Sequence, residues 1–193
     1  MRIVAGQFKG RPLQAPKTDA TRPTSDRARE SLFNMIAHAD WAPALSGARV
    51  IDLFAGSGAL GLEAISRGAG FCVFVETAHA ARGAIRRNIE ALGLFGITRI
   101  HRRSATDLGE IPAGLGGAFD LAFLDPPYYK GLVTPCLAAL TDGLWLSDDA
   151  LVVVETAADE DYTGTDLDRT RTGWRVVSER VSGAAKFWFL KRA

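Results

Sequence analysis

The sequence has little of what a metal centre or a disulfide framework requires. Its 193 residues include two cysteines and three histidines, and none of these stands at metal-ligand or CxxC spacing. We therefore expect no metal site, and we expect Cys72, in an apolar run, to be a plain core residue. No run approaches the roughly 20 apolar residues of a membrane span, and no N-terminal stretch resembles a signal peptide. We expect a cytoplasmic protein with no membrane contact, and a monomer.

The formal net charge is only +1, so the total gives no argument for a nucleic-acid partner. The distribution of charge is uneven, however. Residues 1–30 carry seven basic and three acidic groups, and residues 82–103 carry six arginines against Glu90 alone. Residues 155–168 hold six acidic and no basic side chains, which predicts a solvated loop. The basic N-terminal stretch predicts contacts with nucleic-acid phosphates at Arg11, Arg22, Arg27 and Arg29.

Alternating apolar runs and helical patterns indicate an α/β fold. Helical spacing between the strand-like runs predicts βαβ units and a mostly parallel sheet. Near the end of the chain, two alternating segments flank Ser182-Gly183-Ala184, which predicts a closing hairpin and an antiparallel last strand. The predicted strands are 48–54, 71–75, 97–101, 118–124, 150–155, 174–181 and 186–191, and the predicted helices are 59–67, 78–92 and 132–140.

Residues 1–40 are expected to form a basic extension and a helix that pack on the core of a single domain spanning 1–193. Thr24 is the predicted N-cap of this helix, with Asp26 in its first turn, and the helix runs to about Ala39. Ile3 and Val4 could pair as a short strand.

A glycine-rich motif, Asp52-Leu53-Phe54-Ala55-Gly56-Ser57-Gly58-Ala59-Leu60-Gly61, follows the first predicted strand. Gly56 and Gly58 let the backbone turn tightly and approach a ligand, and the next helix offers unpaired N–H groups. The spacing also fits a dinucleotide-binding loop. Asp52 argues against a dinucleotide ligand, because its carboxylate would repel a pyrophosphate. The same carboxylate could accept from the amino group of an amino-acid-like ligand.

Polar residues also follow the next two predicted strands. Glu76 ends the second strand, where a carboxylate can accept both hydroxyls of a ribose. That arrangement suits either an adenine dinucleotide or S-adenosylmethionine. Ser104 and Ala105 follow the third strand, where such folds usually contact the adenine.

The most informative motif is Asp125-Pro126-Pro127-Tyr128, at the end of the fourth predicted strand. Consecutive prolines cannot donate hydrogen bonds to a sheet, so the strand must end in a rigid turn. Such a turn can stack a flat ring on Tyr128 while Asp125 and the Pro126 carbonyl face the amino group of that ring. This is what methylation of the exocyclic amine of a nucleobase requires.

Together these motifs resemble those of the class I, S-adenosylmethionine-dependent amino-methyltransferases. The N-terminal block narrows the match, because Lys9-Gly10-Arg11 and the run from Thr21 to Asn34 resemble the RsmD family. Members of that family are bacterial guanine-N2 methyltransferases that act on small-subunit (16S) ribosomal RNA. The resemblance covers most of residues 1–155.

The resemblance implies a Rossmann-like class I methyltransferase fold, with a seven-stranded sheet in the order 3-2-1-4-5-7-6 and helices on both faces. It implies that the helix after Thr24 covers the methionine end of the cofactor. The implied partner is ribosomal RNA, alone or within an assembled small-subunit particle. The implied cofactor is S-adenosyl-L-methionine, bound by Asp52, Phe54, Gly56, Gly58, Glu76, Ser104 and Ala105, and the implied catalytic residues are Asp125, Pro126, Pro127 and Tyr128.

The motifs leave rival functions open. Methylation of adenine N6 in DNA uses the same kind of turn, although 193 residues leave little room for a further target-recognition region. Methylation of a glutamine amide in a protein, nucleotide binding without catalysis, and NAD-dependent hydride transfer are the others. The basic N-terminal block favours nucleic acid, and the intact Asp-Pro-Pro-Tyr favours catalysis.

Overall fold

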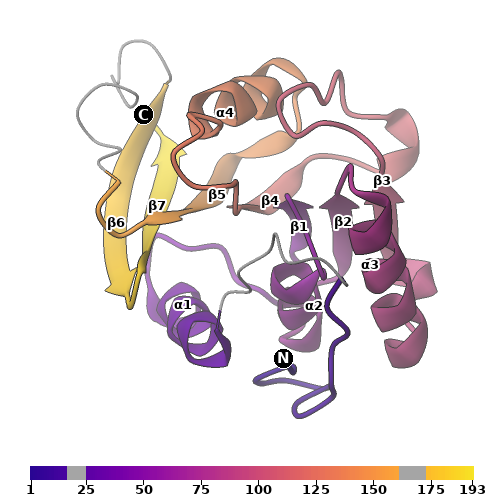
Figure 1. Cartoon of the computed structure of the whole chain (residues 1–193). Coiled ribbons are helices and arrows are strands. Elements are labelled where there is room, and N and C mark those ends of the chain that lie inside the picture. The colour runs from indigo at the N-terminus through magenta and orange to yellow at the C-terminus, as the bar shows by residue number, and fades with distance from the viewer. Residues whose placement is uncertain (17–24, 161–172) are drawn as a thin grey trace.

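The chain folds around one seven-stranded sheet, seen in the computed structural model of residues 1–16, 25–160 and 173–193 (Figure 1). The strand order is β3-β2-β1-β4-β5-β7-β6. β1 to β5 run parallel, and β7 is antiparallel to both of its neighbours. The strands are β1 Arg49–Leu53, β2 Phe71–Val75, β3 Thr98–His101, β4 Phe119–Leu124, β5 Leu146–Ala157, β6 Trp174–Ser182 and β7 Ala185–Arg192.

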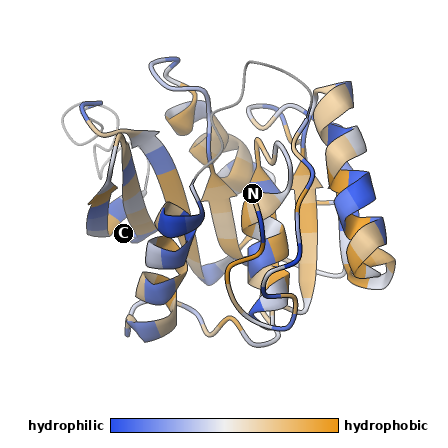
Figure 2. Ribbon diagram, turned by 60° about the horizontal axis from the view of Figure 1, so that its bottom comes forward, coloured by the Kyte–Doolittle hydropathy of each residue, from blue (hydrophilic) through white to orange (hydrophobic). Residues whose placement is uncertain are grey.

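Helices cover both faces of the sheet (Figures 1 and 2). The helices are α1 Asp26–His38, α2 Ala59–Ser66, α3 His79–Leu92 and α4 Val133–Asp142, with short 3₁₀ segments at Phe95–Ile97 and Ala113–Leu115. Alternate residues of each central strand point to opposite faces, so Val50 packs under α1 to α3 while Ile51 packs under α4. Two apolar layers of core therefore lie on the two sides of the sheet.

The predicted fold class, strand number and antiparallel last strand are confirmed, and the differences are local. α1 is capped by Ser25, whose side chain accepts from the Ala28 N–H, and not by Thr24 as predicted. Sequence pattern did not separate two adjacent hydroxyl residues that are both good caps. β5 begins at Leu146, earlier than predicted, because its polar start at Ser147 to Asp149 hides the strand pattern.

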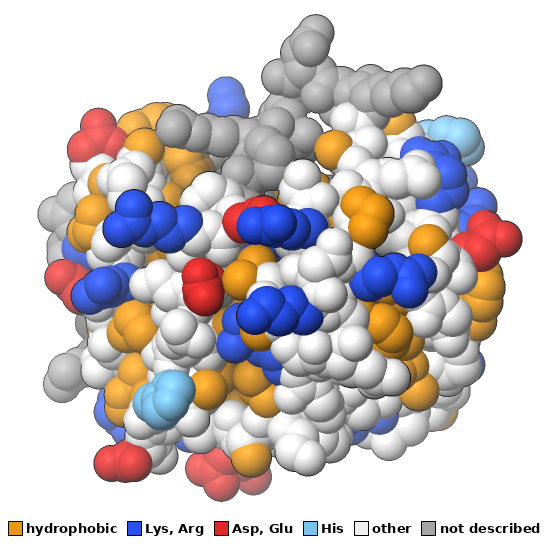
Figure 3. All heavy atoms as spheres, turned by 90° about the horizontal axis from the view of Figure 1, so that it is seen from below, with side chains coloured by type: hydrophobic (Ala, Val, Ile, Leu, Met, Phe, Trp, Pro, Cys, Tyr) orange, Lys and Arg blue, Asp and Glu red, His pale blue; other side chains and the backbone are white. Residues whose placement is uncertain are grey.

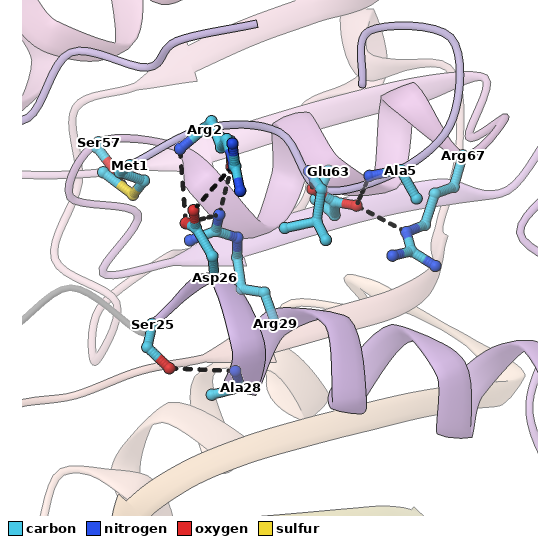
Figure 4. Close-up of polar contacts among 11 residues, drawn as sticks. Met1, Arg2, Ala5, Ser25, Asp26, Ala28, Arg29, Ser57, Glu63 and Arg67 are labelled. Atoms are coloured by element: carbon cyan, nitrogen blue, oxygen red, sulfur yellow. Dashed lines mark hydrogen bonds and ion pairs between the residues drawn. The ribbon is translucent and has the colours of Figure 1, made fainter. Parts of the chain in front are cut away.

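Residues 1–16 form a strap that is held along α2 by buried polar side chains (Figure 4). Glu63 is fully buried, and its carboxylate accepts from the Val4 and Ala5 N–H groups at 2.8 and 3.0 Å. Arg67 pairs with the same carboxylate at 2.8 Å. The Ile3–Val4 pairing expected from sequence is reduced to a single bridge between Arg2 and Pro12. Ser66 of α2 also accepts from the Phe8 N–H at 3.0 Å, and the strap has backbone hydrogen bonds of its own, such as that from the Ile3 N–H to the Arg11 carbonyl. The strap is therefore held both by side chains of α2 and by its own backbone.

The bend of the strap at Gly6 yields the first prediction. A Cβ atom there would lie 1.8 Å from the Ser66 carbonyl oxygen, and φ is +80°. Gly10 has a similar φ of +83° but open space around it. We expect Gly10→Ala to lower the free energy of unfolding by about 1–2 kcal/mol, from backbone strain alone. Gly6→Ala should lower it by at least about 3 kcal/mol, because the clash also displaces the strap.

Urea denaturation of both variants measures this difference. Equal losses at the two glycines would show that the strap does not depend on the close approach at Ser66.

Candidate active site at the carboxyl edge of the sheet

The register of the parallel strands brings the predicted site residues into one row. Leu53 pairs with Val75 on one side and with Leu124 on the other, and Leu124 pairs with Val154. The next residue of each strand is therefore Glu76, Phe54, Asp125 or Glu155, in that spatial order. The carboxyl edge of such a sheet is where open α/β folds bind their ligands. The structure thus gathers residues from four separate strands at one edge.

The glycine loop, residues 54–58, turns sharply between β1 and α2. Phe54, Gly56 and Gly58 all have positive φ, at 58°, 56° and 79°. A Cβ on Gly58 would approach the ring of Phe74 to 3.2 Å, so a side chain there would be both strained and crowded. Phe54 adopts the same left-handed backbone conformation although it is not a glycine. Such strained conformations are often found at functional sites. The loop leaves the backbone of Gly56 and Ser57 partly open at the carboxyl edge.

Asp52 lies behind this loop. Its carboxylate accepts from the Gly61 N–H at 3.0 Å, and the residue is 1% exposed. Burial raises the pKa of Asp52 to about 8, the Gly61 hydrogen bond opposes that rise, and the charge of Glu76 adds to it. The direct contact with a ligand amino group that the sequence suggested is therefore not what the geometry offers. Asp52 instead holds the first turn of α2 against the end of β1.

Glu76 bridges the loop and the next helix. One carboxylate oxygen accepts from the Gly56 N–H at 3.0 Å, and the other accepts from the Ala78 N–H at 2.8 Å, just before α3. The side chain is half-buried at the edge. Ser104 is exposed beyond β3 and shares a 2.8 Å hydrogen bond with the Thr106 hydroxyl, while Ala105 is buried. These residues line the side of the row away from Asp125.

The Asp-Pro-Pro-Tyr turn closes the other side of the row. Asp125 is partly exposed, and its pKa is raised well above the usual value by burial first, and then by the charges of Glu155 and Asp52. Tyr128 is also partly exposed, and its hydroxyl donates to Glu155 at 2.7 Å. The turn ends with Tyr129 at a φ of +58°. A carboxyl group and an aromatic ring are thus presented together by a turn that two prolines stiffen.

Sequence reasoning missed two residues of this site. Glu155 is predicted from sequence only as the end of the fifth strand, although it follows an apolar run, as Phe54, Glu76 and Asp125 do. Asn88 lies on the apolar face of α3 and is 2% exposed. Its side chain forms two hydrogen bonds with the Gln14 backbone, at 2.8 and 3.0 Å, and donates to the Ser57 carbonyl at 2.9 Å. A polar residue within a helix's apolar stripe was the available signal.

The four arginines predicted to contact phosphates have different surroundings. Arg29 is fully buried and pairs with Asp26 at 2.8 Å, so the prediction of an RNA contact there is wrong (Figure 4). Arg27 is exposed on α1, and Arg22 lies outside the described residues. Arg11 is exposed, but its guanidinium donates to the Ala91 carbonyl near the end of α3. Ala91 lies about 18 Å along α3 from His79, and it is His79 that is next to the site.

Figure 3 shows the molecule from the side of the strands' amino ends, opposite the site. Lys and Arg side chains on this face are scattered among apolar and acidic ones. Nearer the site, Arg102 and Arg103 follow β3 and are exposed, as is Arg86 on α3. The described residues contain no cluster of three His, Cys, Asp or Glu side chains suited to a metal ion. Within the same residues, every helix is too short or too polar to cross a bilayer.

The strand order, the antiparallel β7 and the ligand edge define the class I methyltransferase fold. The Escherichia coli protein yhhF, whose structure is solved, superposes with a TM-score of 0.76 at 32% identity, over 100% of this chain and 97% of that one. The family model described as "Conserved hypothetical protein 95" matches residues 1–191. The chain belongs to this family, the RsmD family.

Curated relatives extend over nearly the full chain. Ribosomal RNA small subunit methyltransferase D of Escherichia coli (strain K12) is 33% identical over 192 residues, which is 100% of this chain and 90% of that protein. The protein of the same name from Haemophilus influenzae is 31% identical over 188 residues, covering 97% of this chain and 91% of its own length. The resemblance seen in the N-terminal block is therefore confirmed at the level of the family.

The raised pKa of Asp52 predicts a pH-dependent stability. The ordinary pKa is 3.8 and the folded value is about 8, so between these pH values the folded protein retains a proton that the unfolded chain releases. The contribution is fully present below pH 4 and is lost as pH rises towards 8. Asp52→Asn removes this titration and keeps an acceptor for the Gly61 N–H.

We expect the stability of Asp52→Asn relative to wild type to increase from pH 4 to pH 8 by as much as about 1.4 kcal/mol per pH unit. Urea titrations at several pH values provide the comparison. Parallel pH profiles for the two proteins would place Asp52 in a more polar environment than the structure shows.

Proposed function

We propose that this protein transfers a methyl group from S-adenosyl-L-methionine to the exocyclic N2 amine of a guanine in small-subunit ribosomal RNA. The observation that carries the proposal is the single row at the carboxyl edge, in which the Asp-Pro-Pro-Tyr turn stands beside the glycine loop and Glu76. One end of the row has the groups that suit a cofactor with a ribose. The other end has those that suit a flat base with an amino group.

The residues of the glycine loop fit this cofactor. Gly56 and Ser57 leave part of the loop partly exposed, and the half-buried Glu76 accepts a hydrogen bond from the Gly56 N–H. Glu76 would bind the ribose hydroxyls, with Phe54, Ser104 and Ala105 around the remainder. Asp52 acts through the loop that it holds. The bound cofactor supplies an electrophilic methyl group, and it carries a positive charge that the acidic edge favours.

The Asp-Pro-Pro-Tyr turn would prepare the target amine. The lone pair of an exocyclic amine is delocalised into the base, which makes the amine a poor nucleophile. Hydrogen bonds from its N–H groups to Asp125 and the Pro126 carbonyl would localise that lone pair and align it for attack, so positioning is the main contribution. The raised pKa of Asp125 also makes this carboxylate a stronger base, suited to receive the proton that the amine loses. Tyr128 would stack on the base once it is flipped out.

The names of the full-length relatives favour ribosomal RNA over adenine N6 of DNA, over a protein amide and over NAD chemistry. We further propose that an assembled small-subunit particle is the substrate, and that a monomeric single domain acts on it in the cytoplasm. A chain of this size has little surface for reading an RNA sequence, so the particle would provide much of the specificity. Exposed arginines such as Arg27 would contact phosphates, with Arg11 and Arg22 as further proposed contacts.

Mapping of modified nucleotides by mass spectrometry tests the proposal. Small-subunit ribosomal RNA from cells with and without the protein is digested and compared. One methylguanine should disappear with the protein and return with a wild-type copy, but not with an Asp125→Ala copy. An identical modification pattern in all samples would refute the proposed substrate.

Glu76 supplies a prediction on the cofactor end of the row. Glu76→Ala removes a charge-assisted acceptor that is worth about 1.5–3 kcal/mol, and it also frees the Gly56 N–H from its partner. We expect the affinity for S-adenosylhomocysteine, measured by calorimetry, to fall about tenfold or more. Glu90→Ala, at an exposed position on α3, is the control and should bind normally. Unchanged affinity in folded Glu76→Ala would remove Glu76 from the cofactor site.

Asp125 and Tyr128 supply a prediction on the other end. Asp125→Ala removes an acceptor needed when the amine is aligned, so single-turnover methyl transfer should slow by about 100-fold or more while the fold is retained. Asp125→Asn keeps an acceptor oxygen and should retain more activity. Tyr128→Ala should weaken substrate binding as well as the rate, because stacking also stabilises the ground-state complex. Circular dichroism checks folding, and wild-type transfer by Asp125→Ala would disprove this site.

A further inference from the structure

Glu155 lies at the carboxyl edge, in the strand next to that of Asp125. It is 5% exposed, between the Asp-Pro-Pro-Tyr turn and Phe187 of β7, its partner in the sheet. Removing a carboxylate from water is costly unless hydrogen bonds replace the lost hydration. Its charge also disfavours ionisation of Asp125.

The contact that Glu155 makes connects it to the turn. The Tyr128 hydroxyl donates to Glu155 at 2.7 Å, a hydrogen bond between a phenol and a carboxylate. Two prolines fix the backbone at one end of Tyr128, and Glu155 fixes the hydroxyl at the other. A ring attached at both ends has little freedom to turn about its side-chain torsions. The part of Tyr128 that is exposed is therefore held in one plane.

The neighbouring tyrosine offers a natural comparison. Tyr129 also donates to a carboxylate, Asp159, at 2.6 Å, and its ring lies edge-on to that of Tyr128 with centroids 6.3 Å apart. This second pair is on the surface, because Tyr129 is 65% exposed and Asp159 is exposed too. Water competes freely for such a contact, so it orders the ring far less. Only the Tyr128 pair has a buried acceptor.

We propose that Glu155 is a positioning residue for the target base: by accepting from the Tyr128 hydroxyl, it fixes the plane of the ring on which the base stacks. The inference rests on the proposed function, because it assigns Glu155 to the handling of the same base. A fixed ring lowers the entropy lost when the base stacks, since the ring is already in place. Loss of the anchor should therefore weaken engagement of the RNA more than binding of the cofactor.

A double-mutant cycle tests this inference. Tyr128→Phe removes the donor, Glu155→Met removes the acceptor with little change in side-chain length, and the double variant removes both. The substrate is small-subunit ribosomal particles from cells that lack the protein. We expect each single change to raise KM for the particles about three- to tenfold, and the double variant to be no worse than either. Affinity for S-adenosylhomocysteine should stay at the wild-type value in all three.

Two further variants sharpen the result. Glu155→Gln keeps an oxygen that can accept from the Tyr128 hydroxyl, so its KM should stay closer to wild type than that of Glu155→Met. Tyr129→Phe removes the neighbouring surface contact and should leave KM unchanged. If Glu155→Met does not fold, Tyr128→Phe and Glu155→Gln decide the question without it.

Several outcomes would overturn the inference. These are a wild-type KM for Tyr128→Phe, multiplicative effects in the double variant, or a loss of S-adenosylhomocysteine affinity equal to the rise in KM. Absence of methyl transfer by the wild-type protein would instead refute the proposed function. The two failures are therefore distinguishable in one set of assays.

Discussion

The register of the parallel strands is the constraint on which the site depends. The buried pairs Leu53–Val75, Leu53–Leu124 and Leu124–Val154 are the last pairs between the parallel strands, and each polar residue of the row follows one of them. A slip of one residue in any strand would turn its polar terminus to the other face of the sheet. Because the flanking positions are apolar and buried, such a slip would also expose core side chains. The packing of the hydrophobic core therefore determines where the polar residues of the site lie.

This arrangement concentrates negative charge in one place. Asp52, Glu76, Asp125 and Glu155 all lie near the same edge. Burial raises the pKa values of Asp52 and Asp125, and the charges of their acidic neighbours raise them further. Backbone N–H groups of Gly61, Gly56 and Ala78 and the Tyr128 hydroxyl offset part of the cost. Such an edge is suited to the positive charge of a sulfonium, and to the charge that the attacking amine carries until it loses its proton. Exposed arginines stand farther out, where phosphates would meet them.

The sequence predicted the sheet and the motifs, because apolar runs, glycines and double prolines act locally. It could not predict which way the side chains of the basic block face. Arg27 and Arg29 are two residues apart on one helix, yet one is exposed and the other fully buried against Asp26. It also placed Asp52 at the ligand, although Asp52 is buried and accepts from the Gly61 N–H, a contact that only the folded loop creates. Glu155 and Asn88 were missed because their partners are distant in sequence.

The strap along α2 has a consequence for the order in which parts of this protein can fold during translation. Its hydrogen-bond partners lie far ahead in the chain: Glu63 is 58 or 59 residues beyond the backbone it binds, and Asn88 is 74 residues beyond Gln14. A nascent chain therefore emerges with its first residues unable to dock until α2 and α3 have left the ribosome and formed. The Asn88 side chain donates to the carbonyls of both Gln14 and Ser57, so the glycine loop gains this support only after Asn88 has been made. Translation must pass residue 88 before the glycine loop gains this support, and residue 155 before the row at the carboxyl edge is complete.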